Sequence, residues 1–319
     1  MTIAGSRDTI LACCAQKQSA KNAVDSIACY RNGGRMKKFL TMMGCGVLVA
    51  GMLTGCAGEK KENDNSAAAT QGEVSATDSG ETAKTFTVGF DAEFPPYGYR
   101  NDSGEYVGFD LDLAEEVCKR NGWTLKKQPI DWDSKDMELS SKSIDCIWSG
   151  FTINGREEAY TWSKPYVDNS QVFVVAGDSG INTKNDLEGK IVAVQKDSSA
   201  LAALNDEEEA ANIALRDSFS QLIEYADYNT AFMDLEQGAV DAVAIDTGVA
   251  AYQVSRRSEG AFVILTETLA TEQYGVGFLL GDTELRDEVQ KALDEMAADG
   301  TVAKIAEKWE LSDSVCLGK

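Results

Sequence analysis

The order of apolar and polar residues predicts alternating strands and helices from residue 86 onward. Residues 86–90 (FTVGF) and 190–194 (KIVAV) are short apolar runs rich in β-branched or aromatic side chains, as strands are. A loop and then a helical repeat of apolar residues follow each run. Strands that alternate with helices favour an α/β fold, in which a mostly parallel sheet has helices on its faces.

The two helices that follow these strands have recognisable ends. Asp112 and Glu115 have the spacing of a capping box, which predicts that the first helix begins near Asp112. Gly122 predicts the end of this helix, because glycine readily adopts the left-handed conformation that closes many helices. Ser198 and Ser199 precede the apolar run of the second helix, so we expect that helix to begin there.

An internal repeat indicates two lobes of similar build. Residues 137–147 and 233–243 both contain a methionine, an acidic residue and a leucine, followed at the same spacing by an aliphatic residue, an aspartate and two apolar residues. In each lobe the predicted strand of the repeat ends in a polar cluster, at 149–152 and at 245–247. Ligands of open parallel sheets bind beyond the carboxyl ends of the strands, so both clusters are expected to face one cleft.

Residues 36–56 have the pattern of a bacterial targeting segment. Met36 is followed by two lysines and by the uncharged stretch 39–55, and Leu53-Thr54-Gly55-Cys56 closes the segment. This tetrapeptide resembles the lipobox of bacterial lipoproteins, in which the cysteine receives a diacylglycerol, with fatty acids such as palmitate, before cleavage just ahead of it. The alternatives are an ordinary secretory signal and an uncleaved membrane anchor.

The first 85 residues are therefore predicted to lie outside the folded part. Residues 1–35 are interpreted as a non-native or mis-annotated upstream segment, and residues 36–55 as the lipoprotein signal peptide. Residues 56–85 are predicted to be the lipidated cysteine with a disordered tether. This tether holds no aromatic residue and one large aliphatic residue, Val74, so it cannot bury enough surface to offset its ordering entropy.

Composition narrows the possible functions. A net charge of -22 repels nucleic-acid phosphate and anionic lipid heads, so no nucleic-acid partner is expected, and no membrane contact except the lipid anchor. The chain has no histidine, which excludes Ser-His-Asp and Cys-His catalysis and the two-histidine zinc motifs. The eight cysteines contain no CxxC pair, so neither a metal site nor another cofactor is expected. Cys118, Cys146 and Cys316 are predicted to be buried free thiols, with a Cys118–Cys146 disulfide as the alternative.

Polar and aromatic residues from both lobes are predicted to meet at the cleft. The polar ones are Ser149, Thr152 and Arg156 from lobe 1 and Ser198, Ser199 and Asp246 from lobe 2; the aromatic ones are Phe94, Tyr97 and Trp132. The Arg156 guanidinium suits a carboxylate, hydroxyls and helix N–H groups add donors, and Asp246 suits an ammonium. Aromatic rings supply flat walls. Together these groups predict a pocket for a free α-amino acid.

Each of these residues also has an alternative interpretation. Arg156 follows a loop and precedes two glutamates, which is typical of a solvated surface charge. Asp246 is placed to cap a helix that begins near Thr247, and Ser198 is placed to be an ordinary helix N-cap. Trp132 could instead be a core residue, because tryptophan packs in protein cores more often than it lines a ligand pocket.

Several motifs resemble the polar amino acid substrate-binding proteins of ABC transporters (bacterial extracellular solute-binding protein family 3). In chain order they are Val88-Gly89-Phe90-Asp91-Ala92-Glu93-Phe94-Pro95-Pro96-Tyr97, Gly108-Phe109-Asp110-Leu111-Asp112-Leu113, Ile144-Asp145, Ser149-Gly150-Phe151-Thr152-Ile153, Arg156, Ser163-Lys164-Pro165-Tyr166 and Asp299-Gly300-Thr301. The resemblance covers about residues 86–312. It implies a two-lobed, periplasmic-binding-protein-like α/β fold with hinge crossings near 172–176 and 268–274. Lobe 1 would comprise 86–174 and 273–319, and lobe 2 would comprise 175–272.

The resemblance also implies a role for each site residue. Arg156 and Thr152 match the residues that bind the ligand carboxylate, and Asp246 matches the residue that accepts from the ligand ammonium. Phe94 and Trp132 match the aromatic walls, and Ser198 and Ser199 match hydroxyl donors of lobe 2. Asp91 and Glu93 match the positions near the ligand side chain, and Ser149 and Gly150 belong to the same binding motif as Thr152. The family usually has its arginine one position later, so the tight turn at 154–155 leaves the aim of Arg156 open. The acidic pair suits a basic ligand if its side chains face the pocket, and the sequence does not define which amino acid binds.

The implied function is extracytoplasmic capture of a free polar amino acid by a lipid-anchored monomer. The amino acid would pass to the membrane permease of an ABC importer, with no catalytic residue and no cofactor. Two alternatives from other classes stay open. One is an enzyme of the cyclohexadienyl dehydratase type on the same fold, with Asp91 or Glu93 as its acid. The other is an amino-acid sensor ectodomain.

Overall fold

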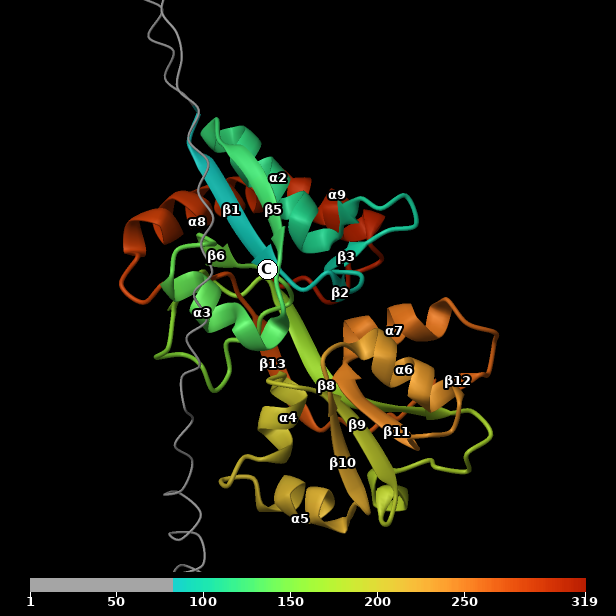
Figure 1. Ribbon diagram of the computed structural model, residues 1–319. Helices are drawn as coiled ribbons and strands as arrows, with labels where there is room; N and C mark the ends of the chain where they lie inside the picture. Colours follow the sequence, from blue (N-terminus) through green and yellow to red (C-terminus); the bar gives the residue numbers. More distant parts are fainter. Residues whose placement is uncertain (1–82) are drawn as a thin grey trace, which may run out of the picture. The chain divides into compact units, whose positions relative to one another are not determined.

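The computed structural model describes residues 83–319, in which the chain forms two main sheets and a small three-stranded sheet (Figure 1). The predicted upstream segment, signal peptide, lipid-bearing Cys56 and most of the tether lie outside the described residues. The folded part begins slightly before the predicted end of the tether, because Thr85 already pairs with Thr124 in the first sheet. None of the helices between residues 83 and 319 is long and apolar enough to cross a membrane.

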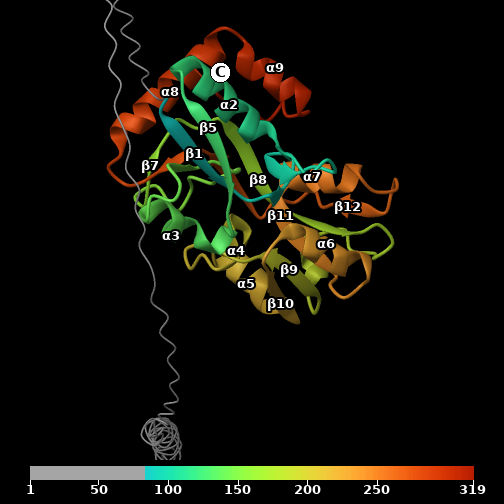
Figure 2. The same cartoon turned by 45° about the horizontal axis from the view of Figure 1, so that its top comes forward.

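We call the part built on the first sheet lobe 1. Its strand order is β5-β1-β6-β14-β7, with β1 (Thr85–Phe90), β5 (Thr124–Pro129), β6 (Cys146–Ile147), β7 (Thr161–Trp162) and β14 (Gly277–Phe278). Its helices are α2 (Phe109–Asn121), the short 3-10 helix η1 (Trp132–Ser134), α3 (Lys135–Ser140), α8 (Thr283–Ala298) and α9 (Thr301–Lys308). The small sheet, β2 (Glu93–Phe94), β3 (Gly98–Arg100) and β4 (Tyr106–Val107), follows β1. The C-terminal helices α8 and α9 pack against α2 (Figure 2).

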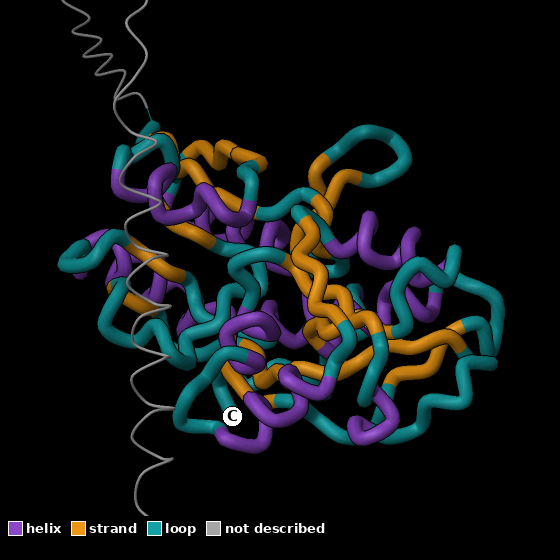
Figure 3. The backbone as a smooth tube through the Cα atoms, turned by 60° about the horizontal axis from the view of Figure 1, so that its bottom comes forward, coloured by secondary structure: helices purple, strands orange, loops and turns teal. Residues whose placement is uncertain are grey.

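We call the part built on the second sheet lobe 2. Its strand order is β10-β9-β11-β8-β12, with β13 also paired to β8. The strands are β8 (Val167–Ala176), β9 (Ile191–Gln195), β10 (Gln221–Tyr225), β11 (Ala242–Asp246), β12 (Phe262–Ile264) and β13 (Ala270–Tyr274). Between and beside them lie η2 (Lys184–Leu187), α4 (Ser199–Leu204), α5 (Ala210–Ser218), α6 (Tyr228–Glu236) and α7 (Thr247–Ser255) (Figure 1). Figure 3 distinguishes helices, strands and loops by colour.

Each main sheet has one strand that runs against the others, so most strands of each sheet share one direction, as the predicted fold class held. The inner strands are parallel, since β1 pairs that way with β5 and β6, and β9 with β10 and β11. The reversed strands are β14 in the first sheet and β8 in the second; β7 pairs antiparallel with β14, and β12 and β13 with β8, so these three run with the inner strands. The two reversed strands are the ones that follow the chain crossings between the sheets. The predicted boundary at residue 174 falls inside β8, because this strand pairs along its length within the second sheet.

The internal repeat corresponds to the same local structure in both lobes. Asp145 precedes β6, and its Oδ2 accepts from the backbone N–H of Thr87 at 2.6 Å. Asp241 precedes β11, and its Oδ2 accepts from the N–H of Ile191 at 2.8 Å. Each aspartate N–H donates back to the carbonyl of the same partner at 2.8 Å. The repeated aspartate therefore fixes the neighbouring parallel strand at the matching point of each lobe.

The first helix ends as predicted but begins earlier than the capping-box pattern indicated. It closes at Gly122, which has a φ of 68°. It begins at Phe109, whose N–H donates to the carbonyl of Pro96 at 2.8 Å, so the first turn is satisfied by backbone and needs no side-chain cap. Asp112 instead accepts from Lys308 Nζ at 2.6 Å and Trp309 Nε1 at 2.7 Å, so a tertiary contact takes the side chain that the local pattern assigned to a cap.

The three cysteines in the described region are free thiols. Cys118 and Cys146 are buried, as predicted, and the alternative disulfide between them is absent from this part of the structure. Cys316 is free but only partly buried, which corrects the prediction for that residue.

Candidate functional site

Most of the predicted ligand-binding residues line one small cavity, which we call the inner pocket. Its lining residues are Asp91, Phe94, Trp132, Ser149, Thr152, Arg156, Gln195, Ser198, Ser199 and Asp246. They come from the ends of β1, β9 and β11, from β2 and η1, from the loop after β6 and from the start of α4, so both lobes contribute. The pocket volume is about 10 Å³, which is room for about one water molecule. An amino acid therefore fits only after the lobes or the side chains move apart.

Glu93, Gly150 and Tyr97 lie outside the inner pocket. Glu93 is exposed and accepts a hydrogen bond from Asn229 of lobe 2. Tyr97 is buried in the core, where its ring meets Tyr274 edge-on at 5.2 Å. Gly150 supports the wall instead of contacting the cavity. It has a φ of +55°, and a side-chain carbon at this position would lie 2.6 Å from the Phe94 ring.

A buried aspartate positions the loop that carries Ser149 and Thr152. Asp110 Oδ2 accepts from the Gly150 N–H at 2.6 Å and from the Tyr166 hydroxyl at 2.9 Å. Burial raises the pKa of Asp110 to about 7, although both hydrogen bonds act against the shift. The motif quoted above contains Asp110, but its sequence pattern does not reveal this contact across the lobe.

Arg156 points across the cleft despite the shortened loop before it. Its Nη2 donates to the carbonyl of Asp197 in lobe 2 at 3.3 Å, and its Nη1 is 3.4 Å from the Thr152 carbonyl. The guanidinium also lies over the Phe151 ring at 5.4 Å. Arg156 is partly buried and lines the inner pocket, so the alternative of a purely solvated surface charge is not supported.

Asp197 is a lobe 2 residue that the sequence analysis missed. Its carbonyl also accepts from Trp132 Nε1 at 3.2 Å, and its carboxylate pairs with the buried Lys135 of lobe 1. The backbone of Asp197 has a φ of 56°, which is the left-handed region that side chains other than glycine seldom adopt. Asp197, on the loop between β9 and α4, thus binds three side chains of lobe 1: Arg156, Trp132 and Lys135.

Asp246 is not used as a helix cap, although it occupies the N-cap position of α7. Its Oδ1 accepts from Asn169 Nδ2 at 2.8 Å, Gln171 Nε2 at 2.6 Å and the Tyr274 hydroxyl at 2.6 Å. Burial, and then the neighbouring Glu272 carboxylate, raise the pKa of Asp246 to about 8. The carboxyl group is therefore held by neutral donors, on a wall of the inner pocket.

The hydroxyl groups of Thr152, Ser198 and Ser199 differ in whether their proton is already donated to another protein group. Thr152 and Ser199 both donate to Glu272, at 2.9 and 3.3 Å, so in this arrangement neither has a proton for a ligand carboxylate. Ser198 is the N-cap of α4, as its alternative interpretation held, and accepts from the Leu201 N–H at 3.2 Å. Ser198 does not donate to Glu272, unlike Thr152 and Ser199, so it is the donor of this group that suits a carboxylate.

The polar residues that the sequence analysis missed share one signal. Each interrupts a strand that is otherwise apolar on its buried face; they are Asn169 and Gln171 on β8, Gln195 at the end of β9 and Glu272 on β13. Gln195 Nε2 donates to Asp91 Oδ2 at 2.7 Å, which links the two lobes beside the inner pocket. Burial raises the pKa of Asp91 to about 6, against the hydrogen bonds from Glu93 and Gln195.

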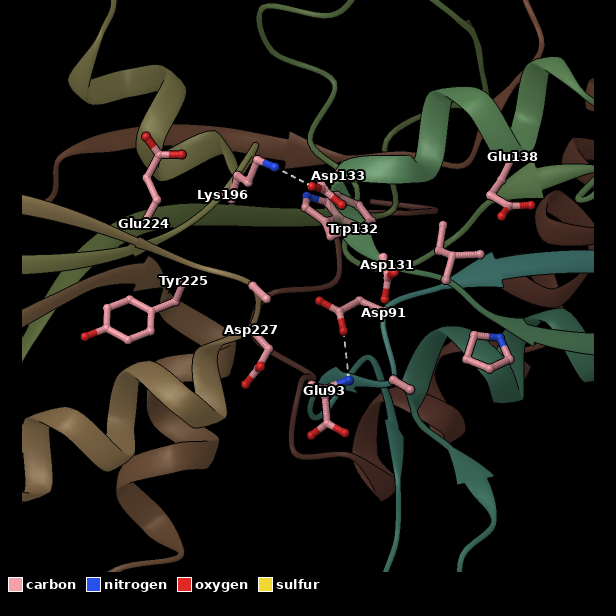
Figure 4. A pocket seen from close by; sticks show the side chains of 14 residues that line it. Asp91, Glu93, Asp131, Trp132, Asp133, Glu138, Lys196, Glu224, Tyr225 and Asp227 are labelled. Carbon is pink, nitrogen blue, oxygen red and sulfur yellow. Dashed lines mark hydrogen bonds and ion pairs between the residues drawn. The ribbon is translucent and has the colours of Figure 1, made fainter. Parts of the chain in front are cut away.

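A larger cavity of about 780 Å³ adjoins the inner pocket, and we call it the outer chamber (Figure 4). Asp91 and Trp132 line both cavities. The charged residues of the outer chamber are Asp91, Glu93, Asp131, Asp133, Glu138, Glu224, Asp227 and Lys196. The lysine is already paired with Asp133 at 2.5 Å, so the chamber is strongly negative.

Residues 86–312 match the family model of bacterial extracellular solute-binding proteins, family 3. The chain belongs to this family. The L-cystine-binding protein of Escherichia coli (strain K12) is 29% identical over 228 residues, which cover 70% of this chain and 82% of that protein. The lysine/arginine/ornithine-binding periplasmic protein of the same strain is 30% identical over 234 residues, covering 71% and 87%. A solved structure of an ABC uptake transporter substrate-binding protein from Streptococcus pneumoniae with bound histidine is 34% identical, covers 72% of this chain and 94% of that chain, and has a TM-score of 0.68.

In this solute-binding protein, Gly150→Ala should be more destabilising than Gly155→Ala. Both glycines have a positive φ, but a side-chain carbon at Gly155 meets nothing within 4 Å, whereas at Gly150 it meets Phe94 and Tyr274. Overpacking costs about 1–3 kcal/mol, so we expect about that difference between the two variants in the free energy of unfolding, measured by urea denaturation. Equal losses would show that Gly150 does not hold the aromatic wall in place.

Proposed function

We propose that this protein captures a free amino acid outside the cytoplasm and delivers it to the membrane permease of an ABC importer. The observation that carries the proposal is that one cavity is lined by Arg156 from lobe 1 and by Asp246 from lobe 2. A zwitterion needs opposite charges at its two ends, and the two lobes supply them. The names of the relatives described above, all of them binding proteins, support binding over the alternatives of an enzyme and a sensor.

The proposed pose follows from the free donors and acceptors of the inner pocket. The Arg156 fork and the Ser198 hydroxyl face the ligand carboxylate, since both have donors to offer. Asp246 accepts from the ligand ammonium. Phe94 and Trp132 cover the aliphatic part of the ligand.

Ligand entry requires the lobes to separate, because the inner pocket holds about 10 Å³. The paired strands β8 and β13 connect the lobes, so we propose that they carry the hinge. A ligand that contacts both lobes favours the closed arrangement over an open one. Lobe closure thereby converts binding into a shape that a permease can distinguish.

The outer chamber favours a ligand with a positively charged side chain. A side chain that extends past Asp91 and Trp132 enters a cavity lined by carboxylates whose one cation is already paired (Figure 4). The negative potential there attracts arginine or lysine and repels glutamate. We therefore propose that the transported amino acid is cationic.

A lipid on Cys56 is the proposed means of membrane attachment. The lipobox pattern at 53–56 supports it, together with the family's extracellular location. Two or more acyl chains anchor a protein stably, whereas one chain binds marginally. An anchored monomer would stay close to its permease.

Replacement of Arg156 or Asp246 by alanine should weaken amino acid binding at least tenfold. A hydrogen bond to a charged group contributes about 1.5–3 kcal/mol, and about 1.4 kcal/mol corresponds to a factor of ten in Kd. The variants should also separate by ligand chemistry in titration calorimetry. Arg156→Ala should lose discrimination between the amino acid and its amide, and Asp246→Asn should lose discrimination against the N-acetyl form. Wild-type affinity in Asp246→Ala would exclude the proposed pose.

L-Arginine or L-lysine should bind more tightly than L-glutamate, and Glu224→Gln should reduce that preference. Glu224 is exposed on the chamber wall, so we expect a loss of about two- to fivefold for the cationic ligand, as for exposed charge pairs. Glu207→Gln is the matched control, since it removes the same charge from lobe 2 away from the chamber. Calorimetry of the amino acid panel at low and high salt measures the effect. Tighter binding of L-glutamate would contradict the assignment of a cationic ligand.

Cys56→Ser should abolish lipid attachment in a bacterial host. Wild-type protein should partition into the detergent phase, and the variant should remain aqueous or accumulate as an uncleaved precursor. Cys45→Ser is the control, because this cysteine lies within the uncharged stretch and not at the end of the tetrapeptide. Mass spectrometry that finds an unmodified Cys56 in the mature wild-type chain would refute the anchor.

A further inference from the structure

Glu272 lies behind the inner pocket and gathers hydrogen bonds from both lobes. It is buried on the face of β13 that also carries Tyr274. Its Oε1 accepts from Thr152 Oγ1 at 2.9 Å, Asn169 Nδ2 at 2.7 Å, Gln171 Nε2 at 2.8 Å and Ser199 Oγ at 3.3 Å. The position of Glu272 is thus defined by donors on several elements.

The hydroxyl groups of Thr152 and Ser199 are polarised by this carboxylate. A hydroxyl has one proton and two lone pairs, and an ionised carboxylate is an acceptor only. Both hydroxyl protons therefore point at Glu272. Thr152 and Ser199 both line the inner pocket, and their hydroxyl oxygens keep lone pairs that can accept a hydrogen bond. Such acceptors can bind a ligand ammonium but cannot donate to a ligand carboxylate.

Glu272 is also in direct electrostatic contact with Asp246. The same two amide nitrogens, Asn169 Nδ2 and Gln171 Nε2, lie 2.6–2.8 Å from Asp246 Oδ1 and 2.7–2.8 Å from Glu272 Oε1. Two buried carboxylates this close cannot both ionise cheaply. Burial, and then the Glu272 carboxylate, raise the pKa of Asp246 to about 8, so Asp246 carries a proton at neutral pH.

We propose that Glu272 is a positioning residue for a ligand ammonium: it keeps the hydroxyl protons of Thr152 and Ser199 away from the inner pocket and favours a proton on the neighbouring Asp246 carboxyl that leaves when the ammonium binds. This inference rests on the proposed function, in which Asp246 accepts from the ammonium. The positive charge of the ligand replaces the proton on Asp246, and the proton passes to solvent. Binding is then coupled to the release of about one proton and strengthens as the pH rises.

Several other titratable or charged side chains lie near Asp246 and Glu272. Burial raises the pKa values of Tyr97, Tyr228 and Tyr274 well above the usual range, so these rings stay neutral at physiological pH. Arg156 lines the same cavity. Two further carboxyl groups titrate in an overlapping range, Asp91 with a pKa of about 6 and Asp110 with a pKa of about 7. The test must therefore separate Glu272 from both.

The experiment is titration calorimetry of the full chain with L-arginine between about pH 6 and pH 8, in two buffers of different ionisation enthalpy. Wild type should release about one proton per L-arginine near neutral pH, and its affinity should rise up to about tenfold per pH unit. Glu272→Gln should release fewer protons and have a flatter pH profile than wild type, because the burial that also raises the pKa of Asp246 remains. Asp91→Asn and Asp110→Asn should keep the wild-type slope. Asp168→Asn, which removes a carboxylate from the outer face of β8, is the control for charge alone.

The possible outcomes separate this inference from the proposed function. If wild type binds no amino acid of the common twenty, the proposed function fails and this inference with it. If wild type binds one without releasing a proton, or if Glu272→Gln keeps the wild-type slope, the role of Glu272 alone is refuted. If Glu272→Gln fails to fold, the absence of proton release in wild type still refutes the role of Glu272, and a release that persists in Asp91→Asn and Asp110→Asn supports it.

Discussion

The burial of carboxylates without a protein cation beside them is the constraint on which the cleft depends. Asp91, Asp110, Asp246 and Glu272 are all buried, and within residues 83–319 none of them forms an ion pair with lysine or arginine. Amide, hydroxyl and backbone donors hold them instead. Burying such charge is unfavourable, and the raised pKa values of three of these groups express that cost. A cleft of this kind gains most from a partner that brings its own positive charge.

The fold supplies those neutral donors by crossing the lobes twice. β8 and β13 pair side by side, so Asn169, Gln171 and Glu272 on these strands meet Asp246 at the end of β11. In lobe 1, Asp110 ties the loop after β6 to the start of α2. The mixed direction of the sheets is therefore part of the site, because a purely parallel sheet would not bring these strands together beside the cleft.

The sequence predicts those features of this structure that depend on residues adjacent in the chain, and it does not predict those that depend on contacts between distant segments. The strands at 86–90 and 190–194, the helix start at Ser198 and the helix end at Gly122 follow from adjacent residues, and they were confirmed. The cap at Asp112 was wrong because α9 and the residue after it take its side chain. Glu272 was not predicted, since its partners lie far away along the chain and only strand pairing joins them.

The loop at Asp197 has a consequence for the kinetics of hand-over. Its carbonyl and carboxylate hold Trp132, Arg156 and Lys135 of the other lobe, and the Asp197 side of these contacts does not line the inner pocket. Such contacts lengthen the dwell time of every bound solute alike, whatever its chemistry. Asp197 is not among the residues that line the inner pocket, so we expect a change at Asp197 to alter how long cargo is held more than which cargo is chosen.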